Sequence, residues 1–314
     1  MTLADFANFS NYAVASATVV LALAWLAYLA EWGFGRQVNT ATELVAADGS
    51  GVASTGRQLP ELPERSRAAG RIGMSLTILA WGILLAGVIA RGLAAERVPW
   101  GNMYEFACAA ILIILTAYLV LVKVWAINWL GPVVTGFGVI VLGLSILVYV
   151  PAGPLVPALH SYWLVIHVAA AMIAGSGFLV GAAASAFYLV KARAEAQTPE
   201  GERTGYIWRL PSAASMDRLA FRVHAFSFPV WTFAALIAGP IWAQYAWGRY
   251  WGWDPKEVWA FITWAIYASY LHARVTAGWK GKAAAIIALI GFVSFVFNFV
   301  GVNLFVPGLH SYAK

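Results

Sequence analysis

Long apolar segments alternate with shorter polar ones along most of the chain. About 17–25 consecutive apolar residues allow a helix to cross the ~30 Å hydrocarbon core of a membrane. Segments of this kind cover residues 12–30, 72–90, 106–122, 130–150, 163–190, 223–242, 258–271 and 283–302, the seventh being shorter and having polar ends. Because backbone polar groups inside a bilayer must be hydrogen-bonded within the protein, such segments form helices. The pattern therefore predicts an all-α polytopic membrane protein with about eight transmembrane helices.

The composition supports this class. Hydrophobic residues make up 61% of the chain and charged residues 11%, whereas charged residues make up about 25% of a soluble domain. An ordinary soluble protein is excluded. The first apolar segment starts too far from Met1, with too little positive charge before it, to be a cleaved signal peptide. We expect it to be retained as a helix.

Basic residues are distributed unequally between the two sets of alternating loops. Loops 31–71, 123–129, 191–222 and 272–282 contain 15 of the 20 Lys and Arg residues, and the remaining loops with the two termini contain 5. Since cytoplasmic loops are enriched in Lys and Arg, both termini are predicted to be extracytoplasmic. The net charge of +6 reflects this bias, so we expect no nucleic-acid partner.

Polar stretches suggest how the chain is organised. We predict an N-terminal transmembrane helix in residues 1–33, a cytoplasmic loop in residues 34–71, and the main transmembrane domain in residues 72–314. Residues 192–218 form a second stretch of loop-like composition. The outer loop, residues 242–259, belongs to the main domain.

Small residues and prolines mark the fifth and sixth predicted spans. Gly177, Gly181 and Ser185 recur at a spacing of four in the fifth span, which favours close packing against a neighbouring helix. Pro229 and Pro240 lie in the sixth span, where we expect them to bend the helix or to mark its ends.

Tryptophan is concentrated in one outer loop. Six of the 16 Trp residues lie in residues 242–264, where an even distribution would place about one, and an interfacial aromatic belt would spread Trp over both membrane surfaces. The cluster also contains charged residues, namely Arg249, Asp254, Lys256 and Glu257. This combination favours a binding platform for a flat aromatic ligand over a simple belt.

The same loop carries a helix-start pattern. Asp254 precedes Pro255, and Glu257 follows three positions after Asp254, as in a helix with an N-cap, a proline at its first position and a capping box. The seventh predicted helix should therefore begin at Asp254, directly after the Trp cluster.

Five histidines are the candidate metal ligands. His160, His167 and His310 lie near the outer surface, and His224 and His272 lie near the inner ends of their spans. Ionisable residues at membrane depth are functional candidates. Two of the three outer histidines could supply the neutral imidazoles of a bis-histidine haem site, with indoles stacking on the porphyrin.

Further residues refine this hypothesis. Arg249 or Lys256 could bind the propionates of a haem. Cys108 is the single cysteine, so an internal disulfide or a Cys-rich metal site is excluded; we expect this residue to have a structural role. His272 lies 18 residues after Asp254, about 27 Å along a helix, and therefore across the membrane from the Trp cluster.

Small side chains precede His272 on one face of its helix. Ala265, Ala268 and Ser269 lie seven, four and three positions before it, which would leave a flat recess beside the imidazole. Ordinary helix packing explains the same pattern equally well.

Several motifs together resemble a known family. The segments are WGRYWGWDPKEVWAFITW (247–264), YLHAR (270–274) and GVNLFVPGLHSY (301–312), with VPWGNMYEF (98–106) and SYWLVIHV (161–168) earlier in the chain. They are similar to the haem-handling proteins of cytochrome c biogenesis, in the CcsA/ResC branch with its tryptophan-rich WWD motif. The resemblance extends over about residues 98–312.

The resemblance implies roles for individual residues. His167 and His310 correspond to an outer pair of haem-iron ligands, and His272 to a ligand within the membrane whose counterpart comes from a CcsB/ResB-type partner. The other haem-contacting positions implied by the motif are Trp247, Trp251, Trp253 and Asp254. His160 and His224 match no ligand of the family.

The resemblance also implies an activity. A protein of this kind binds b-type haem as a transported substrate and presents it for covalent attachment to the Cys-x-x-Cys-His motif of apocytochrome c, as part of a cytochrome c synthase, or haem lyase, complex. Proteins that reduce the acceptor thiols are further partners. The expected location is the bacterial cytoplasmic membrane, or the thylakoid membrane in a plastid, with the Trp-rich loop outside the cytoplasm.

Two alternatives remain open from the sequence. One is a haem exporter or delivery protein without attachment activity. The other is a b-type electron-transfer protein with permanently bound haem, for which His224 and His272 are the pair of similar depth.

Overall fold

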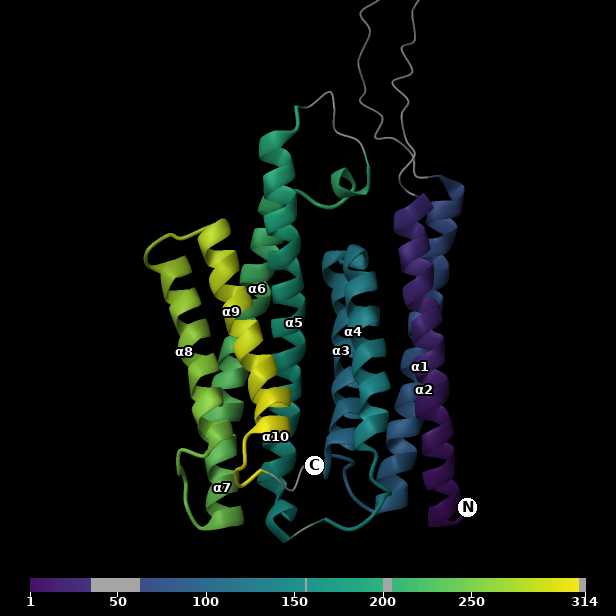
Figure 1. Cartoon of the computed structure of the whole chain (residues 1–314), viewed down its shortest axis with the longest axis vertical. Helices are drawn as coiled ribbons and strands as arrows, with labels where there is room; N and C mark the ends of the chain where they lie inside the picture. Colours follow the sequence, from purple (N-terminus) through teal and green to yellow (C-terminus); the bar gives the residue numbers. More distant parts are fainter. Residues whose placement is uncertain (35–62, 156, 200–204, 311–314) are drawn as a thin grey trace, which may run out of the picture.

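The computed structural model describes residues 1–34, 63–155, 157–199 and 205–310, which form a bundle of long helices (Figure 1). The described residues contain no β-strand. The α-helices are α1 (Leu3–Phe34), α2 (Glu64–Ala95), α3 (Met103–Trp125), α4 (Gly131–Ser145), α5 (Tyr162–Gln197), α6 (Ala213–Thr232), α7 (Gly239–Trp247), α8 (Pro255–Val275), α9 (Lys282–Val296) and α10 (Val302–Phe305). Two π-helical segments, Phe233–Ala238 and Phe297–Gly301, join α6 to α7 and α9 to α10.

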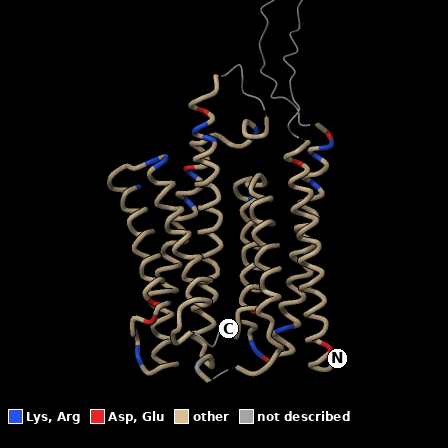
Figure 2. The backbone as a smooth tube through the Cα atoms, in the orientation of Figure 1, with Lys and Arg blue, Asp and Glu red and all other residues tan. Residues whose placement is uncertain are grey.

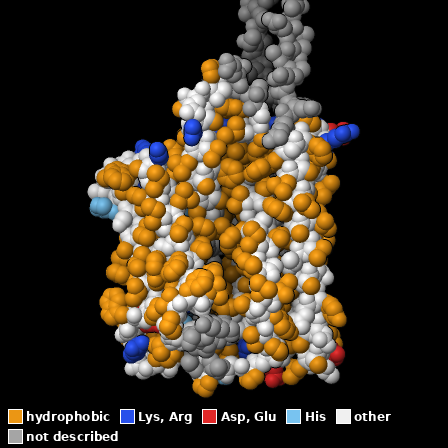
Figure 3. All heavy atoms as spheres, in the orientation of Figure 1, with side chains coloured by type: hydrophobic (Ala, Val, Ile, Leu, Met, Phe, Trp, Pro, Cys, Tyr) orange, Lys and Arg blue, Asp and Glu red, His pale blue; other side chains and the backbone are white. Residues whose placement is uncertain are grey.

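The helices confirm the predicted membrane class. Within the described ranges, seven helical stretches are long and apolar enough to cross a membrane. The remaining predicted span, the seventh (residues 258–271), forms α8, a 21-residue helix that runs beside α6 and α9. Hydrophobic side chains cover the flank of the bundle, whereas charged ones gather toward its two ends (Figures 2 and 3). The protein is therefore an all-α integral membrane protein.

Several helices continue beyond their apolar segments. α2 begins at Glu64, within the predicted cytoplasmic loop, and α5 extends to Gln197. The prediction of a loop over residues 192–218 is wrong for residues 192–197 and 213–218, which are helical. Ala, Glu, Lys and Arg are good helix formers, so a helix continues where hydropathy has already fallen. The rest of the predicted 34–71 loop, residues 35–62, lies outside the described residues.

Both chain ends and the Trp-rich loop lie at one end of the bundle. α1 begins there, α10 ends there, and the loop between α7 and α8 lies at the lower end in the view of Figure 1. The first and the last described helices thus have their outer ends on the same side of the bundle. We call this end the Trp end of the bundle.

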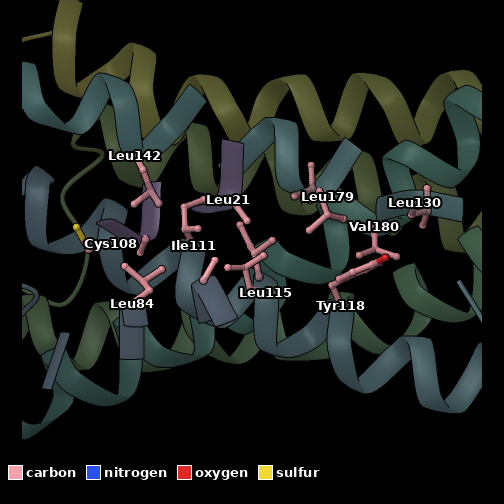
Figure 4. Packing of buried hydrophobic residues seen from close by; sticks show 14 of the residues in the cluster. Leu21, Leu84, Cys108, Ile111, Leu115, Tyr118, Leu130, Leu142, Leu179 and Val180 are labelled. Carbon is pink, nitrogen blue, oxygen red and sulfur yellow. The ribbon is translucent and has the colours of Figure 1, made fainter. Parts of the chain in front are cut away.

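The first four helices pack around a common core with α5. Leu21 of α1, Leu84 of α2, Leu115 of α3 and Leu142 of α4 are buried there together (Figure 4). Cys108 lies in the same cluster and is buried, in agreement with a structural role.

The small residues of α5 allow close contact with α6. A Cβ atom added at Gly177 would lie 1.9 Å from Oγ of Ser227, and one added at Gly181 would lie 2.5 Å from Cε1 of His224. Neither position therefore accepts a side chain without rearrangement. The predicted close approach is confirmed, and its partners are the polar side chains of α6.

The two prolines of the sixth span lie inside one continuous helical stretch rather than at its ends. Pro229 lies within α6 and Pro240 in the first turn of α7, on either side of the π-helical segment Phe233–Ala238. π-helical turns often occur at functional sites. This segment and the neighbouring end of α5 are therefore candidate parts of such a site.

Candidate functional site

A cavity lies at the Trp end, between α3, α5, α7, α8 and the segment after α10. It contains about 1050 Å³ of space free of protein atoms, including its open mouth. Its Trp and Phe wall residues are Trp100, Phe106, Trp231, Trp242, Trp247, Trp251 and Phe299. An aromatic cavity of this size suits a large, flat, mostly apolar ligand.

His167 reaches this cavity from the first turns of α5. Its Nδ1 lies 2.8 Å from the carbonyl oxygen of Ala234, in the π-helical segment. A carbonyl oxygen only accepts, so Nδ1 carries the proton and Nε2 keeps its lone pair. The imidazole stacks on Trp242, with ring centroids 6.0 Å apart and an angle of 12° between the planes.

His310 lines the same cavity from the segment after α10. Its Nδ1 donates to Oδ1 of Asp254 over 3.1 Å, so Nε2 of His310 also keeps its lone pair. The ring lies edge-on to Trp247 at 4.9 Å and also contacts Trp242 at 5.6 Å between centroids. Trp242 is therefore in ring contact with both histidines.

Asp254 connects the Trp-rich loop to the C-terminal segment. It caps α8 in the predicted capping box, in which its own N–H donates to Oε2 of Glu257 over 2.9 Å. Its Oδ2 accepts from the N–H of Leu309 over 3.1 Å. Gly308 lies against this carboxylate, since a Cβ there would be 2.8 Å from Oδ2. One aspartate thus starts a helix and positions His310.

The ionisation of this pair favours metal binding. Burial lowers the pKa of His310 below its ordinary value, although the hydrogen bond to Asp254 partly opposes the shift. Burial raises the pKa of Asp254, but the hydrogen bonds from His310 and from the N–H of Leu309 outweigh it and hold the pKa below its usual range. At neutral pH a neutral imidazole therefore faces an ionised carboxylate, the arrangement that orients metal-binding histidines.

The tryptophans of the loop occupy different places. Trp247 and Trp251 line the cavity. Trp253 lies outside it, with 64% of its surface exposed and a left-handed backbone φ of 57°. It packs edge-on against Trp251, with centroids 5.7 Å apart. The predicted platform is thus divided between two tryptophans that face the cavity and one that faces outward.

The segment before α3 forms another wall. Trp100, Gly101, Asn102 and Met103 line the cavity. Behind them Glu105, whose side chain is fully buried, accepts hydrogen bonds from the N–H of Gly101 at 2.9 Å, from Arg97 at 2.7 Å and from Arg91 at 3.0 Å. A buried carboxylate with several donors holds such a loop firmly.

His272 and His224 lie outside the cavity and face different directions. His224 is fully buried, and its ring lies 5.0 Å from Tyr267 and 5.1 Å from Tyr270 of α8. His272 is exposed. At about 100° per residue it points about 140–160° away from those two tyrosines around the helix axis. The two histidines therefore do not converge on one iron. His160 is exposed beside α5 and does not line the cavity.

Several wall residues were not predicted from the sequence. Trp100 and Trp231 are two of them, and Asn298 and Asn303 are two more, whereas Trp242 belongs to the predicted Trp cluster of residues 242–264. The VPWGNMYEF motif pointed to the first. Polar residues within an apolar segment are functional candidates. On this ground the two asparagines of the last span could have been predicted as site residues.

The sequence is similar to that of known proteins. The family described as cytochrome C assembly protein matches residues 100–310, which include both cavity histidines and the Trp-rich loop. The cytochrome c biogenesis protein CcsA of Synechococcus elongatus is 34% identical over 292 residues, covering 78% of this chain and 87% of the relative. CcsA of Guillardia theta is 34% identical over 257 residues, covering 77% and 85%.

A solved structure shows a similar fold. The cytochrome c heme lyase CcmF superposes with a TM-score of 0.63 at 17% identity, and the match covers 95% of this chain and 47% of that chain. The present chain thus spans less than half of that protein, and the likeness concerns the fold.

Proposed function

The chain belongs to the cytochrome c assembly protein family, and we propose that it binds haem in the cavity at the Trp end and presents it for covalent attachment to apocytochrome c. One observation carries the proposal. His167 and His310 line one cavity, and each has its Nδ1 bound to an acceptor so that Nε2 keeps its lone pair. Two oriented neutral imidazoles can ligate the iron of a haem.

The residues of the cavity fit haem. Its walls carry indole rings that match the porphyrin faces, and apolar and aromatic side chains form most of its lining, as in other ligand sites. Trp242 is in ring contact with both imidazoles, so it would lie beside the two histidines that bind the haem. The bound haem supplies two vinyl groups, which are the sites of attachment.

The chemistry needs little from this chain beyond positioning. Each acceptor thiol adds its sulfur and its proton across one vinyl double bond, so no oxidant or leaving group is involved. Cys108 lies in the helix core, away from the cavity wall, and the nucleophiles come from the Cys-x-x-Cys-His motif of the acceptor. Holding vinyl and thiol together replaces an encounter of two molecules by a local step.

The two histidines have different roles in this proposal. His167 is anchored in α5 and bound to the backbone of a neighbouring helix. His310 lies on a non-helical segment held through Asp254. His310 is therefore the ligand that the histidine of the acceptor motif replaces when the product leaves.

A second haem position involves His272 and a partner. Its imidazole is exposed in the last turn of α8, on the face that points away from Tyr267 and Tyr270. A CcsB/ResB-type membrane protein that covers this face would supply the second ligand. Haem would then pass from this position to the cavity at the Trp end.

The same proposal includes the membrane location and the remaining partners. The basic loops lie on the cytoplasmic side of the bacterial cytoplasmic membrane, or of its thylakoid equivalent, and the Trp end faces outward. Thiol-reducing proteins complete the pathway, because an acceptor whose two cysteines form a disulfide has no thiol to add.

Reconstitution tests the proposal. We would co-express the protein, a CcsB/ResB-type partner and an apocytochrome in cells without other assembly machinery, and measure covalent haem in the product. The His167→Ala and His310→Ala variants should lose product and the bis-imidazole spectrum, and added imidazole should restore both. His160→Ala is the matched control, because this exposed histidine lies outside the cavity.

The outcomes separate the alternatives. A normal spectrum in the His167→Ala, His310→Ala double variant would show that the outer pair is wrong. Covalent product that forms only when an unrelated lyase is added would favour a delivery protein without attachment activity. A permanent b-type haem between His224 and His272 is disfavoured, because these side chains point in different directions.

A further inference from the structure

Lys256 places a positive charge on the wall of the cavity. It lies in the first turn of α8, and its Nζ is 5.3 Å from the centroid of the Phe299 ring. Within the described part of the chain, no carboxylate oxygen lies within 4.0 Å of this ammonium group. A positive charge on a largely aromatic cavity wall lowers the stability of the protein unless a negative charge lies near it.

The nearby carboxylates are already engaged. Asp254 accepts from His310 and from the N–H of Leu309. Glu257 accepts from the N–H groups of Gly252 and Asp254, both at 2.9 Å. These bonds build the loop and orient His310. Lys256 is therefore left to interact with something in the cavity.

The wall around Lys256 differs from the rest of the cavity. Asn298 and Asn303 lie on either side of Phe299 in the sequence and line the cavity with it, and the side-chain oxygen of each is buried without a hydrogen-bond partner. The opposite wall, on α5, carries apolar residues such as Leu164 and Val168. The cavity is thus polar on one side and apolar on another, as an amphiphilic ligand requires.

We propose that Lys256 binds a carboxylate of the tetrapyrrole and so fixes its rotation within the cavity. The inference rests on the proposed function. A protoporphyrin carries its two propionates on adjacent pyrroles and its two vinyl groups on the other two. A carboxylate bound at Lys256 therefore turns the vinyl edge away from the start of α8, and sets which edge meets the acceptor thiols.

The positions of the two basic residues favour Lys256 over Arg249 as the group that binds the carboxylate. Arg249 is exposed, and its Cζ lies 2.1 Å from the position that a Cβ of Gly252 would occupy. Its guanidinium thus covers the backbone of the loop and does not line the cavity. Arg249 serves as the matched control for removing one positive charge from this region.

The test compares haemin with its dimethyl ester, in which both carboxylates are neutral. Each is titrated into the purified full-length protein in detergent, and binding is followed by the absorbance of the bis-imidazole complex. We expect the wild type to prefer haemin by about tenfold or more, the size of a charge-assisted hydrogen bond. Lys256→Met should lose this preference by weakening haemin alone, and Lys256→Arg should keep it.

The comparison has clear outcomes. Arg249→Met should bind both ligands as the wild type does. A Lys256→Met variant that still prefers haemin would overturn the role of Lys256, as would a wild type with equal affinities, a result that needs no variant to fold. If the wild type gives no bis-imidazole spectrum with either ligand, the haem site itself is wrong, and the role of Lys256 is overturned with it.

Discussion

His310 and Asp254 lie 56 residues apart in the chain and are joined by a 3.1 Å hydrogen bond from Nδ1 to Oδ1. This bond ties the segment after the last helix to the start of α8, beside the Trp-rich loop. The aspartate that ends the tryptophan motif thus holds an imidazole in the cavity, and its carboxylate lies behind the histidine that we propose as a haem ligand.

Asp254→Asn should weaken haem binding by about 10–100-fold, the usual effect of removing a carboxylate behind a metal-bound histidine. Asparagine is also a good N-cap, so the start of α8 should be retained. Haem titration of the purified protein gives the affinity, and circular dichroism checks the helix content. An unchanged affinity would show that Asp254 only caps the helix.

Haem binding should persist below pH 6.5 and fail on stronger acidification. His310 has a pKa below its ordinary value of 6.5, and its neutral form binds iron, so the folded protein keeps this ligand where a free imidazole would protonate. The measurement is the bis-imidazole absorbance between pH 8 and about 4. Loss of the spectrum centred at or above pH 6.5 would contradict the shifted pKa.

The same shift predicts how stability depends on pH. Because the folded state holds His310 deprotonated, the unfolded chain binds its proton first as the pH falls below 6.5. The contribution of this group is therefore complete above pH 6.5 and declines below it. Thermal unfolding of the wild type should lose more stability between pH 7 and about 5 than that of His310→Ala.

Gly181→Ala should destabilise the protein by about 1–3 kcal/mol, the usual cost of overpacking a close contact. The new Cβ would lie 2.5 Å from the ring of His224. Gly82→Ala is the control, since a Cβ at that helical position meets nothing within 4 Å and alanine favours a helix over glycine by about 1 kcal/mol. Thermal unfolding in detergent should show the two changes with opposite sign.

Trp251→Ala and Trp253→Ala should have separable effects. Trp251 lines the cavity, whereas Trp253 is 64% exposed. Removing Trp251 should weaken haem binding by about 0.5–1.5 kcal/mol, as the loss of an aromatic contact does. Removing Trp253 should leave haem affinity nearly unchanged and reduce covalent product, because its ring faces the side that an acceptor approaches. Equal losses of haem affinity would contradict this division.

The sequence by itself determined the membrane class and the positions of the helices. Apolar segments of sufficient length have few alternatives to a helix in a bilayer, so all eight predicted spans are helical. The capping pattern at Asp254 was also predictable, because it depends on neighbouring positions in the sequence. The close packing at Gly181 was predictable because glycine has no side chain. Helix ends were less predictable, since α5 continues to Gln197 through polar residues that favour a helix.

Only the tertiary structure decided which side chains meet. The family resemblance named His167 and His310 as a pair, but no periodicity relates residues so far apart, and only the fold brings them to one cavity, from α5 and from the segment after α10. Trp251 faces inward and Trp253 outward because the loop backbone turns between them, and Lys256 lines the cavity where Arg249 does not. Local sequence specifies the backbone of each helix, whereas the direction of a side chain across the bundle depends on how the helices pack together.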